Sequence, residues 1–263
     1  MVLRVSGTKE QPMRGVMFFA FNNSKTDYYS MAVKAAKRVK HFLNLPVTIV
    51  TDSQPLNPEF NIINVSAETS NHKDNNPWYN KGRYRAYDLS PYDETILLDT
   101  DYLVNSTQLL KVFDMYEDFM CHDSTYFLTE GYDTEMVSEQ SFKTLWATVI
   151  VFKKTERVKH IFECLEMVQN NYSHYINLYH INSPMYRNDY GVTIATHIVD
   201  GHTINKQNYI PWTLNHVNSY VKVYKLNDTE YMMLNETGKR AEYMIVKDMD
   251  FHCMNKETFM ELV

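Results

Sequence analysis

Two aspartates separated by a single residue, Asp99 and Asp101, directly follow the apolar run Thr95–Leu98. Side chains at positions i and i+2 of an extended chain share a face, so the two carboxylates can converge. Two like charges held close together repel unless a cation neutralises them, and Mg²⁺ or Mn²⁺ prefers such oxygen ligands. The pair therefore predicts a divalent-metal site, although the same spacing also occurs in solvated turns at strand ends.

The C-terminal segment supplies a third ligand and a cation for the same site. An imidazole can complete a shell of two carboxylates, and His252 is the candidate. Lys256 follows four residues later and can meet a diphosphate as a point charge. Either residue alone is more simply read as structural. Together with the aspartates they predict a metal site formed by Asp99, Asp101 and His252.

Apolar runs alternate with amphipathic segments along the chain, and this alternation must position those residues. The expected strands are 15–21, 47–51, 60–65, 95–99, 119–121, 147–152, 221–226, 231–234 and 243–246. The expected helices are 28–45, 78–89, 156–172 and 190–199, with loops over 66–77 and 130–142, the second of them mobile. The pattern predicts an α/β fold with a mixed, mainly parallel sheet flanked by helices. Such sheets bind ligands beyond the C-terminal ends of their strands.

Charge and composition exclude several classes of protein. The 263 residues include 26 basic and 32 acidic side chains, for a net charge of −6, which disfavours broad non-specific binding to nucleic acid. A local basic groove would have to come from Lys34–His41, Lys153–Arg157 or Lys206. The sequence has no GxGxxG after the first strand and no GxxxxGK[ST], which disfavours a dinucleotide site and a P-loop.

Cysteine use and hydropathy predict where the protein works. The three cysteines are widely spaced and form no CxxC, so we expect free thiols in a reducing compartment. The apolar runs are shorter than the ~20 residues of a membrane helix, and the first residues lack a signal-peptide core. We expect a cytoplasmic protein with no membrane partner.

The order of these pieces resembles the GT-A (Rossmann-like) glycosyltransferases with a DxD motif, in the branch of glycogenin-like and galactosyltransferase-like enzymes. The matching pieces are Gly15–Phe21 with Asn22 and Asn23, Val47–Asp52, Tyr79–Tyr87, Leu97–Asp101, Trp146–Thr155, Tyr186–Gly191 and His252–Lys256. The HxxGxxKPW ending of that branch is absent. The resemblance implies one nucleotide-sugar-dependent domain over residues 1–263, with Mn²⁺ or Mg²⁺ as cofactor and a nucleoside-diphosphate sugar, UDP-sugar above all, as donor.

The resemblance also implies roles for single residues. The donor-binding positions are Asn22, Tyr28, Asp52, Lys81, Arg83, Arg85, Asp99 and Thr100. Tyr28 would stack on the base and Asp52 would accept from uracil or ribose, although Asp52 is equally suited to a turn. Arg83 and Arg85 are not separated by the sequence.

Asp189, Asp101 and Lys256 are the catalytic candidates. Asp189 would act as general base if the reaction inverts, or position sugar and acceptor if it retains, as the glycogenin-like resemblance favours. A carboxylate at this place is also a good helix cap. Trp146 and Trp212 are the acceptor-binding candidates: Trp146 would line the sugar pocket, and Trp212 would stack on the acceptor.

The acceptor is less specified than the donor. The small size, the many Asn and Tyr residues, the lack of a membrane anchor and the segment Arg187–Ile198 resemble phage-encoded glycosyltransferases, some of which add glucose or arabinose to the hydroxymethyl group of modified cytosine. Duplex DNA in the host cytoplasm is therefore one expected acceptor, and a saccharide or lipid-linked glycan is another. A sugar-phosphate nucleotidyltransferase is disfavoured because Asn22 and Asn23 stand where a Gly-rich loop is usual. A non-catalytic binding module is disfavoured by the complete set of Asp99, Asp101, His252 and Lys256.

Overall fold

The structure is a computed structural model that describes residues 11–56, 58–68, 71–73, 76–139, 141–203, 209–238 and 241–263. Its central sheet has six strands in the order β3-β2-β1-β6-β11-β8. They are β1 (Arg14–Phe19), β2 (Val47–Thr51), β3 (Asn61–Asn64), β6 (Glu94–Leu98), β8 (Phe119–His122) and β11 (Trp146–Lys153). β11 runs antiparallel to both of its neighbours, β6 and β8, and the other neighbouring strands of this sheet are parallel. The predicted mixed, mainly parallel sheet is confirmed.

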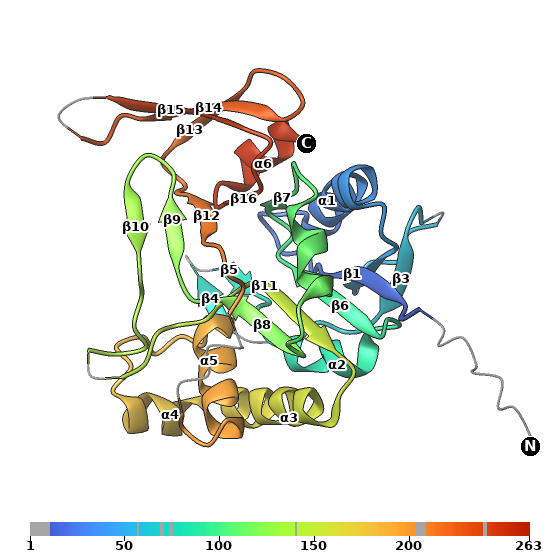
Figure 1. The fold of residues 1–263 in the computed structure, drawn as a ribbon, viewed down its shortest axis with the longest axis vertical. Helices are drawn as coiled ribbons and strands as arrows, with labels where there is room; N and C mark the ends of the chain where they lie inside the picture. Colours follow the sequence, from blue (N-terminus) through green and yellow to red (C-terminus); the bar gives the residue numbers. More distant parts are fainter. Residues whose placement is uncertain are drawn as a thin grey trace, which may run out of the picture.

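Alternate residues of the central strands face two different apolar layers. Val16 and Phe18 of β1 pack in the same core as helix α1 (Tyr28–Leu43), while Met17 between them points to the opposite core. That opposite core contains residues of α3 (Glu156–Asn170) and α5 (Asn188–Val199). Figure 1 shows α1 on one side of the sheet and α3, α4 (Tyr172–Tyr179) and α5 on the other. The period of two along each strand thus produces the two helical layers.

A second sheet joins the end of β6 to the C-terminal segment. Its order is β10-β9-β12-β16-β7. The strands are β7 (Tyr102–Leu103), β9 (Thr125–Phe127), β10 (Gly131–Asp133), β12 (Leu214–Val217) and β16 (Phe251–Cys253). β7 follows Asp101 directly, and its Tyr102 is paired with His252 of β16. This short pairing brings together segments about 150 residues apart, which is what the predicted site requires.

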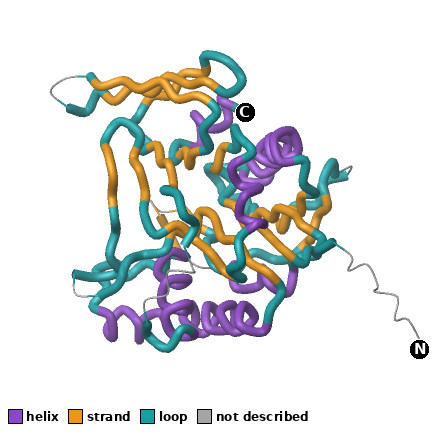
Figure 2. Tube along the Cα trace, viewed as in Figure 1, coloured by secondary structure: helices purple, strands orange, loops and turns teal. Residues whose placement is uncertain are grey.

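The chain ends in a three-stranded antiparallel sheet and a short helix. The strands β13 (Lys222–Lys225), β14 (Glu230–Asn235) and β15 (Glu242–Lys247) confirm the three predicted C-terminal strands. In Figure 2 this sheet lies at the top of the molecule, beyond the second sheet. The helix α6 (Lys256–Leu262) follows β16 and begins at the predicted phosphate-binding lysine.

The region before β6 differs from its prediction. Residues 66–77, expected as a loop, include the strands β4 (Asn71–Lys73) and β5 (Asn76–Trp78). The helix expected over 78–89 is wrong, since only the 3-10 turn η1 (Arg83–Arg85) and the four-residue helix α2 (Ala86–Leu89) form there. The reason is Gly82, whose φ of 87° ends any helical run before Arg83, with its N–H given to Gln169 Oε1 at 3.0 Å.

Two further boundaries are corrected. Residues 130–142 were expected as a mobile loop, but they include β10, and Glu135 is held by Arg187 and Tyr190. The helix expected over 156–172 ends at Asn170, because the Asn171 side chain donates to the carbonyl of Met167 at 2.8 Å, and α4 then begins.

Several short elements gave no signal in the sequence. These are α4, α6, the 3-10 segment η2 (Gln108–Asp114) and the strands β7, β9, β12 and β16. All three cysteines are free, with Cys121 and Cys253 buried and Cys164 half-buried. Within the described part of the chain, no helix combines the length and apolarity needed to cross a membrane.

Candidate active site

A cavity of about 640 Å³ opens where β1 and β6 end and β11 begins. This is the edge of the central sheet at which the sequence predicts a ligand. Ten of the predicted site residues line it, namely Tyr28, Lys81, Arg83, Asp99, Thr100, Asp101, Trp146, Asp189, His252 and Lys256. The structure therefore brings together residues from six separate segments of the chain around one cavity.

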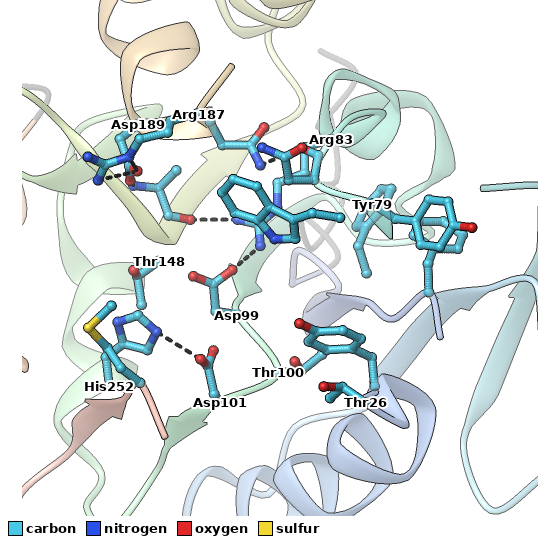
Figure 3. A pocket seen from close by; sticks show the side chains of 18 of the residues that line it. Thr26, Tyr79, Arg83, Asp99, Thr100, Asp101, Thr148, Arg187, Asp189 and His252 are labelled. Atoms are coloured by element: carbon cyan, nitrogen blue, oxygen red, sulfur yellow. Dashed lines mark hydrogen bonds and ion pairs between the residues drawn. The ribbon is translucent and has the colours of Figure 1, made fainter. Parts of the chain in front are cut away.

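Asp99, Asp101 and His252 form a cluster on the floor of the cavity. One ligand atom from each lies within 4.8 Å of the others. The side chain of Asp101 is 5% exposed, and His252 Nε2 is 3.1 Å from Asp101 Oδ2. Figure 3 shows both carboxylates pointing into the cavity with the His252 ring turned toward Asp101. Two carboxylate oxygens and one imidazole nitrogen are a donor set that fits Mn²⁺ or Mg²⁺.

Each carboxylate of this cluster also holds a cationic side chain. Arg83 pairs with Asp99, and Lys256 pairs with Asp101. Burial alone would raise the pKa of Asp101, but His252 and Lys256 hold it well below its usual range. Burial opposes charge on Lys256, and Asp101 nevertheless raises the pKa of its ammonium. The carboxylate is thus kept ionised, as a metal ligand must be.

The structure separates the two arginines that the sequence left open. Arg83 lines the cavity, and its guanidinium also donates to the carbonyl of Ala147 at 2.8 Å. Arg85, two residues later, is not among the lining residues. The left-handed turn at Gly82 sets this direction, because it starts the 3-10 turn that carries Arg83 inward.

A second charged group, which we call the Asp189 cluster, consists of Asp189, Arg187 and Glu135. Asp189 Oδ1 accepts the N–H of Ala147 at 2.9 Å, and Oδ2 accepts from Arg187 at 3.0 and 3.2 Å. Arg187 also pairs with Glu135 at 3.1 Å. Burial opposes charge on Arg187, but Asp189 and Glu135 raise the pKa of the guanidinium. Both oxygens of Asp189 are therefore held in fixed directions.

Arg187 and Glu135 were missed by the sequence analysis. Arg187 lies in the segment that carries Asp189, so a cation two residues from a candidate catalytic carboxylate was a usable signal. Glu135 lies in a segment expected as a mobile loop, and nothing in its neighbourhood along the chain marks it. Its role can be recognised only from the fold, which brings Arg187 and Tyr190 into contact with it.

Aromatic side chains gather on the β1 side of the cavity. The lining residues there include Phe19, Phe21, Tyr28, Trp78 and Tyr79. Two lysines, Lys25 and Lys81, line the same side. Aromatic faces and ammonium groups together suit a nucleotide, whose base stacks and whose phosphates are negative.

Three other predicted residues do not line the cavity. Asn22 accepts the N–H of Tyr29 at 2.8 Å and so holds the start of α1. Asp52 is exposed beyond the end of β2. Trp212 is half-buried and meets the buried ring of His122 edge-on at 6.4 Å. Their predicted roles in donor or acceptor binding stay predictions.

Trp146 and His216 form the wall behind the metal cluster. Trp146, a predicted acceptor residue, is 7% exposed and lines the cavity, with its ring 6.0 Å from that of His216. His216 is 3% exposed, and its Nδ1 lies 3.2 Å from Nδ1 of His252. Burial, reinforced by His252, lowers the pKa of His216 to about 2. His216 was missed because nothing in the sequence links it to His252.

Four residues of the basic segments considered for DNA binding are bonded to other groups of the protein. Lys34 donates to the carbonyl of Met260, and Arg38 is buried against Val104 and Asn105. Lys153 donates to the carbonyl of Met115. Arg157 pairs with Asp118 and Asp200. None of these basic residues lines the cavity. Lys206 lies outside the described residues.

Comparisons with known proteins give distant likenesses only. No family model matches the chain, and no curated protein has a similar sequence at a significant level. The galactosyltransferase LgtC in complex with donor and acceptor sugar analogs is 15% identical, with 70% of each chain covered and a TM-score of 0.47. The glycosyltransferase GlyE of Streptococcus pneumoniae TIGR4 is 13% identical over 76% of this chain, with a TM-score of 0.43.

A nucleotidyltransferase is more distant still. The 4-diphosphocytidyl-2C-methyl-D-erythritol synthase of Anaerococcus prevotii DSM 20548 is 10% identical over 72% of this chain and 98% of its own, with a TM-score of 0.36. The present chain spans only 45% of the length of GlyE. Every one of these TM-scores is below 0.5, so function rests on the residues of the site.

Proposed function

We propose that this protein is a glycosyltransferase that moves a sugar from a nucleoside-diphosphate donor, a UDP-sugar above all, to a hydroxyl group. The observation that carries the proposal is the convergence of Asp99, Asp101 and His252 in one cavity with Lys256 beside them. A group of this kind matches the charge that develops on a diphosphate leaving group. The aromatic side of the cavity supports a nucleotide next to it.

The metal cluster has the donor set for Mn²⁺ or Mg²⁺, held by Asp99, Asp101 and His252. When bound, such an ion supplies Lewis-acid neutralisation of the diphosphate. Arg83 and Lys256, which pair with the same carboxylates, would add positive charge at the phosphates as the glycosidic bond breaks. Thr100 lies between the two aspartates and lines the cavity where the donor would pass.

Asp189, in the first turn of α5, also lines the cavity. Its two oxygens are occupied by the N–H of Ala147 and by Arg187. A carboxylate whose two oxygens are held in fixed directions is a good anchor. We therefore assign Asp189 the positioning of donor sugar and acceptor rather than general-base catalysis, which goes with the retaining outcome. Trp146 forms the adjacent apolar wall for the acceptor.

A saccharide or lipid-linked glycan is the acceptor that we favour. A duplex DNA acceptor would require several phosphate contacts beside the cavity. Lys34, Arg38, Lys153 and Arg157 are instead bonded to groups of the protein itself. A hydroxymethylcytosine duplex stays in the test because sugar transfer to it can be measured directly.

The test is a donor screen with purified protein, Mn²⁺ or Mg²⁺ and a panel of nucleotide sugars, with release of nucleoside diphosphate as the measurement. Asp101→Asn is the inactive variant, and Asp114→Asn is the matched control because Asp114 is exposed and outside the cavity. Release in the parent and the control, but not in Asp101→Asn, supports the proposal. No release with any donor, under any metal condition, refutes it.

The acceptor is tested in parallel with the most active donor. Saccharide acceptors and a hydroxymethylcytosine duplex, the duplex at two salt concentrations, are compared by mass spectrometry of the products. Transfer to a saccharide alone supports the favoured acceptor. Transfer to the duplex, with a steep loss of binding at high salt, would replace it.

A further inference from the structure

The proposed function does not use His216, a buried histidine that lies beside His252. His252 directs Nε2 toward Asp101 Oδ2 at 3.1 Å, and its opposite ring nitrogen, Nδ1, lies 3.2 Å from Nδ1 of His216. The two rings are nearly perpendicular, with centroids 4.7 Å apart and an interplanar angle of 84°. One nitrogen of His252 therefore faces the carboxylates, and the other faces a single neighbour.

The geometry fixes what His216 can do. A histidine that ligates a metal through Nε2 must present a lone pair there, so a neutral ring carries its proton on Nδ1. The Nδ1–H of His252 then needs an acceptor, and the group at hydrogen-bond distance is Nδ1 of His216. Metal-binding histidines usually donate their other N–H in this way, which sets the tautomer and orients the ring.

We propose that His216 is a positioning residue for the metal site: it accepts the Nδ1–H of His252 and so holds Nε2 directed at the metal. This inference rests on the metal role in the proposed function. It concerns a residue that lines the cavity but does not belong to the ligand group found among the described residues, which comprises Asp99, Asp101 and His252.

The backbone holds the two rings side by side. His216 of β12 and His252 of β16 are direct partners in a parallel pairing, which places their side chains on the same face of the second sheet. The carbonyl of His216 also accepts the N–H of Leu128 at 2.9 Å. β12 is thus held from both sides, by β9 and by β16.

Aromatic neighbours restrict the His216 ring further. The ring of Phe127 lies 4.7 Å from it and that of Trp146 lies 6.0 Å from it. With 3% of the residue exposed, His216 cannot rotate without displacing one of them. A rigid acceptor of this kind is what orients a ligand, whereas a solvent-exposed partner would leave the His252 ring free to turn.

The experiment measures Mn²⁺ affinity in the presence of UDP by titration calorimetry, which requires no sugar transfer. His216→Phe keeps a ring of similar size without an acceptor, and His216→Asn places a carbonyl oxygen near the position of Nδ1. We expect His216→Phe to bind Mn²⁺ about 10- to 100-fold more weakly and His216→Asn to stay within about threefold of the parent. A purely structural role would weaken both variants alike or neither.

His122→Phe is the matched control, because His122 is also a fully buried histidine and lies outside the cavity. It should bind Mn²⁺ as the parent does, with all variants checked for cooperative thermal unfolding. Parent-like affinity in His216→Phe, or equal weakening in the Phe and Asn variants, overturns the proposal. Absence of Mn²⁺ binding in the parent overturns it too, whereas the proposed function is judged separately by release of nucleoside diphosphate.

Discussion

Asp101 and Asp189 line the same cavity, but their partners come from different places in the chain. Asp101 is held by His252 and Lys256, the latter 155 residues away in sequence. Asp189 is held by Arg187, two residues away, and by the N–H of Ala147. The first set of partners consists of side chains: in the proposed function Lys256 turns to a phosphate and His252 to a metal ion. The second set includes a backbone group that cannot move away.

This difference predicts a division of work. Variants of the metal cluster should change metal and donor binding, because its ion pairs are the ones that a metal and a diphosphate would replace. Variants of the Asp189 cluster should change the transfer step while leaving metal and nucleotide affinity in place. The two clusters can therefore be separated by binding and by rate.

The largest effect is expected for Asp101→Asn. The change removes one charge from the metal cluster and leaves Lys256 without its carboxylate partner. We expect release of nucleoside diphosphate to fall by about 10²–10³-fold or more, as loss of one strong electrostatic contact at a reacting centre does. Stopped assays over several enzyme concentrations measure it. A parent-like rate would contradict the role of the metal cluster in this reaction.

His252→Ala is expected to come next. Loss of one of three ligands should weaken Mn²⁺ binding by roughly 10- to 100-fold, measured by titration calorimetry with UDP present. His160→Ala is the control, because His160 lies exposed on α3. Unchanged Mn²⁺ affinity in His252→Ala would remove His252 from the ligand set and leave Asp99 and Asp101 to be tested alone.

Asp189→Asn tests the other side of the comparison. The amide oxygen can still accept the N–H of Ala147, but the charge that faces Arg187 is lost. We expect sugar transfer to fall by about 10²-fold, the cost of misplacing reacting groups, with Mn²⁺ and UDP affinities unchanged. Weakened Mn²⁺ binding in this variant would show that the two clusters are not independent.

The same comparison explains which parts of the site could be predicted from the sequence. Asp99 and Asp101 follow a buried strand, so their spacing and position are local features that the sequence displays. His252 was a candidate third ligand on chemical grounds, but its place beside Asp101 could not be predicted, since the register that pairs it with Tyr102 involves strands of two and three residues. Such strands have too few residues to show a periodicity of their own.

The central sheet was predictable for the complementary reason. Its strands are short segments rich in apolar and β-branched residues, and α1 and α3 show three-and-four spacing, so local pattern and tertiary packing agree. The helix predicted over 78–89 does not form because Gly82 adopts a left-handed conformation that the surrounding residues do not indicate. Glu135 was missed because its partners, Arg187 and Tyr190, are more than 50 residues away in the sequence.

The smallest expected effect concerns how the stability of the fold depends on pH. His122 is fully buried, and burial lowers its pKa from about 6.5 to about 3. Because the unfolded chain takes up this proton first, the folded state loses stability as pH falls from about 6.5 toward 3. His122→Phe removes the group and should leave stability at pH 7.5 nearly unchanged. At pH 5 the variant should be more stable than the parent by roughly 2 kcal/mol. Urea unfolding at the two pH values measures this, and an equal pH dependence in parent and variant would contradict it.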